Sequence, residues 1–243
     1  LSREDADFLA EVQQVLEPFA DTQGFVVSNT TPALKSFYKA LADRNWLALS
    51  WPVSAGGLGR PPIQEFLLWN EAHFRNIGRA PQGVGVVAKT IIRHGTDAQK
   101  AKWLEPIRRH DITFALAYSE PNAGSDLGSL QCKAVLEGDR YIVTGNKCWN
   151  SKAHTVDYLW LLCRTGEASS GKKGLTLLIV DAKSPGVVIR PLDLMCGNKV
   201  TEIFFDGAEV PVTQRIGPEN GAWKLITEAL AAAGFPTPEP PRA

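Results

Sequence analysis

The sequence lacks the features that mark several classes of protein. No apolar run approaches the roughly 20 residues needed to span a bilayer, and the first residues, LSREDADFLAEVQQ, are acidic and amphipathic, unlike a signal or transit peptide. Lys plus Arg and Asp plus Glu are equal at 26 each, so no net charge attracts nucleic acid or an acidic membrane surface. These absences predict a soluble, cytoplasmic protein without a membrane span.

Cysteine is scarce and its spacing is uninformative. The chain has four cysteines, Cys132, Cys148, Cys163 and Cys196, with no CxxC pair and no Cys/His spacing typical of zinc. We therefore expect buried, reduced thiols and no metal site.

Familiar catalytic motifs are also missing. There is no GxSxG elbow to supply a serine nucleophile, and neither GxxxxGK[ST] nor GxGxxG to cradle a nucleotide. Two unusual stretches stand in their place: YSEPNAGSDLGS at 118–129, directly after the apolar FALA, and TGNKCWNS at 144–151.

The first half of the chain has helical periodicity. Apolar residues recur at steps of three and four, and Ser2, Thr31 and Thr96 are candidate N-caps, with Pro32 at a first helical position. The pattern predicts helices over 3–19, 31–49, 63–78, 81–95 and 96–111.

The pattern changes near residue 111 to short runs rich in β-branched and aromatic residues, separated by turn signals. It predicts strands over 112–118, 131–138, 140–149, 157–165, 175–182, 186–193 and 201–210. No helical run of ten or more residues interrupts them, which argues against a parallel sheet of βαβ units. Helical periodicity returns at 221–233, where a stripe of Trp223, Ile226 and Leu230 needs a partner.

The predicted fold class is therefore α+β. We expect an all-α domain over 1–112 and an antiparallel β-barrel or sandwich over 113–215. The first helix of a further helical domain and a Pro-rich tail would occupy 216–243.

Alone, each unusual stretch has two readings. Backbone N–H groups of residues 122–125 could converge on an anion because Gly124 permits a positive φ, but the stretch is also typical of an ordinary β-turn loop. Glu120 and Asp126 would then be turn residues that bond their own backbone. Similarly, NKCWNS alone predicts a strand whose Trp149 packs in the core.

The order of the motifs narrows these readings. WPVSAGGLG, RHGTDAQKAKWLEPI, ALAYSEPNAGSD, YIVTGNKCWNS, EIFFDGAEVP and IGPENGAWKLI follow one another between residues 35 and 230. Together they resemble the acyl-CoA dehydrogenase family. The resemblance implies a helical domain, a middle β-domain and a C-terminal four-helix bundle, with FAD held between the last two. It also implies a homo- or hetero-oligomer that oxidises an acyl-CoA to the 2,3-enoyl-CoA and passes electrons to an electron-transferring flavoprotein.

The resemblance also implies roles for individual residues. Ser119 would bond the flavin pyrimidine edge, and N–H groups near Tyr118 and Ser119 would meet the ring oxygen. Gly124 and Ser125 would touch the FAD pyrophosphate, with Ser125 also near the CoA arm. Trp149 would pack on the isoalloxazine and Ser151 would lie near N5. Leu116 departs from the family, where this position is often aromatic.

The family's catalytic base, a Glu of the C-terminal bundle, has no counterpart in these 243 residues, so the catalytic residue is not assigned. The resemblance implies that the sequence stops within the bundle's first helix, and we expect weak FAD binding and little turnover. The chain could be a fragment of a longer enzyme, a subunit completed by another polypeptide or a short inactive relative. A non-catalytic scaffold, or an oxygen-using acyl-CoA oxidase or flavin monooxygenase, remains an alternative function.

Overall fold

The computed structural model describes residues 1–20, 31–195 and 197–232. Predictions that concern Cys196, the Leu230 side chain and the Pro-rich segment 234–243 lie outside this part.

The helices begin where their periodicity and caps predict them, but the helix expected over 31–49 ends at Asp43, because Asn45 adopts a left-handed φ of +58°. Ser2 and Thr96 each close a capping box, and the Thr31 side chain accepts a hydrogen bond from the Leu34 N–H. These caps satisfy backbone donors that the first helical turn leaves free. The helices of this half are α1 (Arg3–Leu16), α2 (Pro32–Asp43), α3 (Pro62–Phe74), α4 (Lys89–His94) and α5 (Asp97–Arg108).

The helix expected over 81–95 differs from the prediction in its first half. Gly83–Ala88 forms a π-helix that continues into α4. Gly83 is buried there, and a Cβ at this position would lie 3.2 Å from the Phe114 ring. The absence of a side chain therefore lets this wider turn approach the first strand closely.

The second half forms one mostly antiparallel sheet, in the order β6-β7-β3-β2-β4-β5-β8. All seven expected strands are present, together with a two-residue eighth. They are β1 (Phe114–Ala117), β2 (Lys133–Glu137), β3 (Arg140–Ser151), β4 (Tyr158–Arg164), β5 (Leu175–Asp181), β6 (Val187–Asp193), β7 (Lys199–Pro211) and β8 (Arg215–Ile216).

Two parts of the sheet prediction are wrong. The end strands β6 and β8 do not pair with each other in the described residues, so the sheet is not a closed barrel. Two pairings with β4 are parallel rather than antiparallel, those of β1 and β2. Because β2 and β3 lie between β1 and β4 in the chain, the connection is long enough for the parallel pairing.

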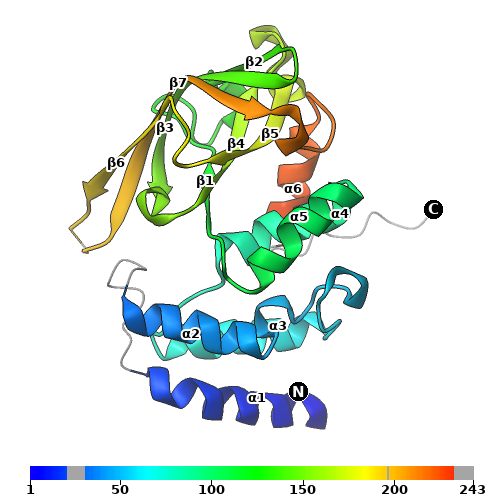
Figure 1. The fold of residues 1–243 in the computed structure, drawn as a ribbon. Helices are drawn as coiled ribbons and strands as arrows, with labels where there is room; N and C mark the ends of the chain where they lie inside the picture. The colour runs from blue at the N-terminus through cyan, green and yellow to red at the C-terminus, as the bar shows by residue number, and fades with distance from the viewer. Residues whose placement is uncertain (21–30, 196, 233–243) are drawn as a thin grey trace.

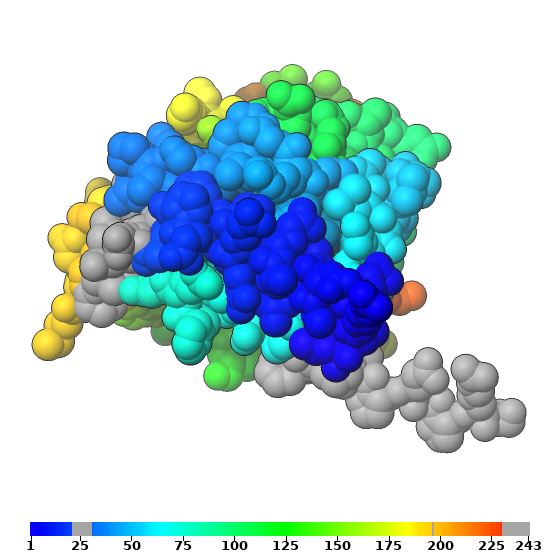
Figure 2. Space-filling view, turned by 90° about the horizontal axis from the view of Figure 1, so that it is seen from below, coloured from blue at the N-terminus to red at the C-terminus, as the bar shows by residue number. Residues whose placement is uncertain are grey.

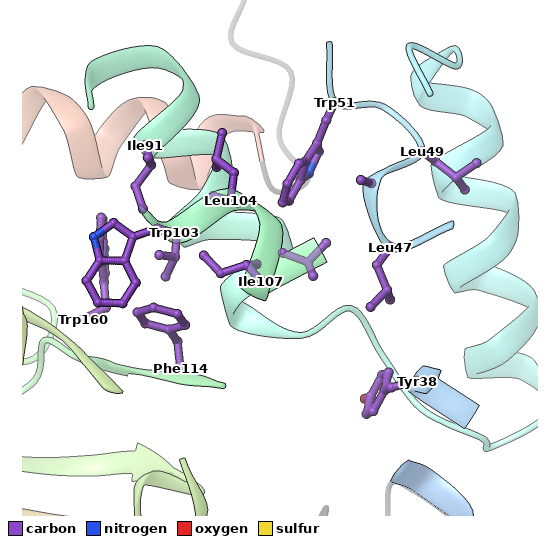
Figure 3. Close-up of a cluster of buried hydrophobic side chains, with 14 of the residues drawn as sticks. Tyr38, Leu47, Leu49, Trp51, Ile91, Trp103, Leu104, Ile107, Phe114 and Trp160 are labelled. Atoms are coloured by element: carbon purple, nitrogen blue, oxygen red, sulfur yellow. The ribbon is translucent and has the colours of Figure 1, made fainter. Parts of the chain in front are cut away.

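Helices and sheet share a core because β4 buries both of its faces. Leu159, Leu161 and Cys163 pack inside the β-domain, whereas Trp160 and Leu162 pack toward the helices. Figure 3 shows Trp160 beside Trp103 of α5 and Phe114 of β1. In Figure 1 the sheet lies above α4 and α5, α2 and α3 lie below these, and α1 is outermost. The dark-blue α1 crosses the face seen in Figure 2.

The last helix, α6 (Ala222–Ala232), finds the partner that its apolar stripe requires. Leu225 and Ile226 are buried in the core that α4 and β5 also line. The Lys172 ammonium lies 4.5 Å from the centre of the Trp223 ring, and His94 Nε2 lies 2.7 Å from Glu228 Oε2. This helix is therefore anchored to both the helical half and the sheet.

The cysteines that can be assessed are as expected. Cys132, Cys148 and Cys163 are free and buried, and burial raises the pKa of the Cys132 thiol to about 11. Such a thiol stays protonated and unreactive at neutral pH. Among the described residues, no helix is long and apolar enough to cross a membrane.

Candidate functional site

The two unusual stretches of the sequence lie side by side. The Asn150 side chain donates a hydrogen bond to the Leu116 carbonyl (2.8 Å), and the Cys148 N–H donates to the Ser119 carbonyl (2.9 Å). The end of β1 is thus tied to the last residues of β3. We call residues 116–120 and 147–151 the β1–β3 edge.

Trp149 has an unusual position in the β1–β3 edge. The pairing of β3 with β7 shifts register between Lys147 and Asn150, which makes a β-bulge at Trp149. Its φ is +60°, a left-handed value uncommon for a bulky residue, and its side chain is 64% exposed. The reading of Trp149 as a core aromatic is therefore wrong, because the bulge turns the indole out of the sheet.

A buried ion pair supports the edge from beneath. Lys147 is fully buried, and its ammonium donates to Glu120 Oε1 (2.8 Å) and to the Tyr118 carbonyl (2.9 Å). Glu120 also accepts from the N–H groups of Gln131 (2.7 Å) and Cys132 (2.9 Å). Charges are buried only where such partners are available.

The sequence reading of Glu120 as a residue that bonds its own turn is therefore wrong. Its backbone partners lie eleven and twelve residues away, just before β2. A lysine inside an otherwise regular strand was the available signal, because Lys is almost never fully buried without a counter-charge.

Residues 121–130, which we call the glycine loop, leave the edge through a tight turn. The N–H groups of Glu120 and Ala123 each donate to the other's carbonyl, at 2.9 and 3.2 Å. Gly124 and Ser125 follow and are exposed. Gly124 does not use the positive φ that glycine permits. A Cβ at Gly124 would meet nothing within 4 Å, so the surface beside it is open.

Arg164, which the sequence analysis missed, holds the far end of the glycine loop. Its guanidinium is buried and donates to the carbonyls of Leu130 (2.9 Å) and Gly128 (2.7 Å). No sequence motif marks Arg164 at the end of β4, so only the tertiary structure reveals that it binds these two carbonyls.

The other predicted site residues differ in exposure. Tyr118 points inward, where Trp160 Nε1 donates to its hydroxyl at 3.0 Å, and burial raises the pKa of the Tyr118 phenol far above its usual value. Only its backbone can contribute to a surface site. Ser119 is half-buried and Ser151 is exposed. Ser119, Trp149 and Ser151 thus share one edge, with Gly124 and Ser125 just beyond the turn.

A cavity of about 470 Å³ opens beside Ser151. It lies between the start of the π-helix, the end of α5 and the end of β3, and Val84, Ile107 and Phe114 form part of its apolar wall. Figure 3 shows Tyr38, Ile107 and Phe114, all of which line it. We call this space the Ser151 cavity.

The structure has a helical half packed on a mostly antiparallel sheet, with a glycine loop beside an exposed tryptophan. This is the arrangement that the sequence resemblance predicts. The family models agree with it: "Acyl-CoA dehydrogenase, N-terminal domain" matches residues 6–111, and "Acyl-CoA dehydrogenase, middle domain" matches residues 115–208. The chain belongs to the acyl-CoA dehydrogenase family.

Individual relatives agree with this assignment. The chain is 38% identical over 200 residues to acyl-CoA dehydrogenase FadE29 of Mycobacterium tuberculosis, a match that covers 82% of this chain and 52% of the relative. It is 33% identical over 226 residues to mitochondrial isovaleryl-CoA dehydrogenase of Pongo abelii, covering 86% and 52%. The chain thus spans about half the length of these curated relatives.

Solved structures show the same fold. The ChsE4-ChsE5 complex from Mycobacterium tuberculosis is similar with a TM-score of 0.88 at 31% identity, over 96% of this chain and 60% of that one. A structure described as the Tcur3481-Tcur3483 steroid ACAD has a TM-score of 0.85 at 33% identity, over 96% and 63%.

Proposed function

We propose that this chain provides the FAD-facing part of an enzyme that dehydrogenates an acyl-CoA thioester at its α,β bond. The observation that carries the proposal is Trp149, an exposed indole held in a left-handed bulge between two serine positions of one edge. Strained backbone that persists in a folded protein often marks a functional site. An exposed tryptophan also offers an apolar face on which a planar ligand can stack.

The donor set of the β1–β3 edge fits a flavin. Trp149 would cover the isoalloxazine, while Ser119 and Ser151 would offer hydroxyls to its pyrimidine edge and to N5. Gly124 and Ser125 would approach the pyrophosphate. A Cβ built at Gly124 would meet nothing within 4 Å, so there is room beside it for the phosphates. When bound, FAD supplies the hydride acceptor.

The Ser151 cavity suits the acyl group of the substrate. Its volume of about 470 Å³ is within the usual range for small-molecule sites. Its position beside Ser151 would bring an acyl chain next to the residue that we assign to N5. The same apolar wall would exclude water from the reacting carbons.

The general base must come from elsewhere. Among the described residues, the one carboxylate of the β1–β3 edge and the one carboxylate of the cavity lining are already engaged: Glu120 with Lys147, and Asp111 with Arg109 at 3.3 Å. We propose that the base and the second wall of the flavin site lie outside the described residues. The similar ChsE4-ChsE5 structure is a complex, which favours completion by another polypeptide as one route. An electron-transferring flavoprotein is the proposed acceptor.

Flavin retention and turnover by the purified 243-residue chain test the proposal. After incubation with FAD and desalting, we expect a fraction of the chain to keep the visible absorption of oxidised flavin. Dye-linked oxidation of acyl-CoA should be about 10²–10⁴-fold slower than that of a complete dehydrogenase, the usual effect of losing a general base. A chain that shows no FAD binding by calorimetry would favour the non-catalytic scaffold instead.

A further inference from the structure

The Ser151 cavity carries an excess of positive charge. Five cationic side chains line it, Lys35, Lys39, Arg79, Arg109 and Lys152, against one carboxylate, Asp111. The whole chain, by contrast, has equal numbers of the two signs. The cavity lining therefore has a local excess of positive charge that the chain as a whole does not have.

Among the described residues, only two of these five cations form a salt bridge with a carboxylate. Lys39 pairs with Asp43 on the same helix, and Arg109 pairs with Asp111. Within residues 1–20, 31–195 and 197–232, no carboxylate lies within salt-bridge distance of Arg79 or Lys152. These two cations, from distant parts of the sequence, face the same space unpaired.

Their juxtaposition is unfavourable without an anion. Lys152 is half-buried, and its pKa is lowered to about 8, first by loss of hydration and then by the charge of Arg79. Arg79 is exposed, so the cost of lost hydration falls on the Lys152 ammonium, and the like charge of Arg79 adds to it. An anion between the two side chains would offset both effects.

Backbone contacts position the two residues that carry these cations. The Tyr38 hydroxyl donates to the Arg79 carbonyl at 2.9 Å, and the Tyr38 ring packs against His110 with centroids 4.6 Å apart. Lys152 has a left-handed φ of +61°, and its carbonyl accepts from the N–H (3.0 Å) and the hydroxyl (2.9 Å) of Thr155. These contacts hold the two backbones before any ligand arrives, which reduces the entropy lost on binding.

The rest of the lining indicates what kind of anion fits. Val84, Ile107, Ile112, Phe114 and Val156 make the wall largely apolar. Such a space favours a hydrocarbon chain that carries one anionic end over the polar phosphates of CoA.

We propose that the Ser151 cavity binds a carboxylate at the end of the acyl group that is far from the thioester, between Arg79 and Lys152. The preferred substrate class is then an acyl-CoA whose acyl chain ends in a carboxylate. This inference rests on the proposed function, because the acyl group must enter beside Ser151.

Calorimetric titration of the FAD-supplemented chain with adipoyl-CoA and hexanoyl-CoA tests it. The two thioesters have the same carbon number and differ in the terminal carboxylate. We expect adipoyl-CoA to bind roughly tenfold more tightly, the effect of about one charge-assisted hydrogen bond. Arg79→Gln or Lys152→Gln should reduce the preference to about twofold or less, while Lys173→Gln, at an exposed position in 168–174, should leave it unchanged.

The other outcomes contradict the proposal in distinguishable ways. Equal binding of the two thioesters to the unaltered chain would overturn the carboxylate site and leave the proposed function standing. If Arg79→Gln reduces the affinities for adipoyl-CoA, hexanoyl-CoA and free CoA by the same factor, the cations bind a phosphate of CoA. That result would also overturn the carboxylate site. If neither thioester binds, both proposals fail. Unfolding curves of each variant show whether a loss of binding reflects a loss of fold.

Discussion

Replacing Lys147 with methionine should lower the free energy of unfolding by about 3–5 kcal/mol, the usual effect of removing one partner of a buried ion pair. Lys147 is fully buried and is the counter-charge of Glu120, whose side chain is 7% exposed. Without the ammonium, the carboxylate would be buried with only the N–H groups of Gln131 and Cys132 as partners. Urea unfolding followed by circular dichroism measures the change.

Two further variants separate this explanation from simple loss of a lysine. Lys39→Met removes an exposed cation that pairs with Asp43, and should change stability by no more than about 1 kcal/mol. Adding Glu120→Gln to Lys147→Met removes the stranded charge and should restore part of the loss. A single Lys147→Met variant as stable as Lys39→Met would show that the buried pair does not support the β1–β3 edge.

Replacing Trp149 with alanine should weaken FAD binding by about 30-fold, a loss of roughly 2 kcal/mol that is typical of a central aromatic contact. Stability should change little, because the indole is 64% exposed. Trp149→Gly should weaken FAD binding similarly while stabilising the chain, since glycine adopts the φ of +60° without strain. Flavin fluorescence titration and urea unfolding together separate the two effects.

Phe74 offers a matched control for Trp149. It is also a large exposed aromatic, at 83%, but lies at the end of α3. Phe74→Ala should leave FAD affinity unaltered. Unchanged affinity in Trp149→Ala would refute the stacking role and leave the exposed bulge without a ligand.

The helices and strands could be predicted because their signals are local. The caps at Ser2, Thr31 and Thr96 precede apolar residues at helical spacing, and each cap forms. The strand runs alternate or are wholly apolar, and all seven form. The parallel pairing of β1 with β4 could not be predicted in this way, because it depends on strands that are far apart in the chain.

The candidate site was predictable only in part, for the same reason. The motifs pointed to Ser119, Gly124, Ser125, Trp149 and Ser151, but not to the bulge against β7 that exposes the Trp149 indole. A lysine inside a predicted strand signals the need for a counter-charge, but the sequence does not show that Glu120, from the other motif, supplies it. The excess charge of the Ser151 cavity was least visible, because Arg79 and Lys152 meet only in the folded chain.

The most direct test of the account is to map FAD binding on the ¹⁵N-labelled chain by NMR. We expect the largest amide shifts at Ser119, Gly124, Ser125 and Ser151, with a shift of the Trp149 indole N–H, and little change on α1 or α3. Shifts centred on the helical face of α3, or no shifts at saturating FAD, would contradict the claim that the β1–β3 edge faces a flavin.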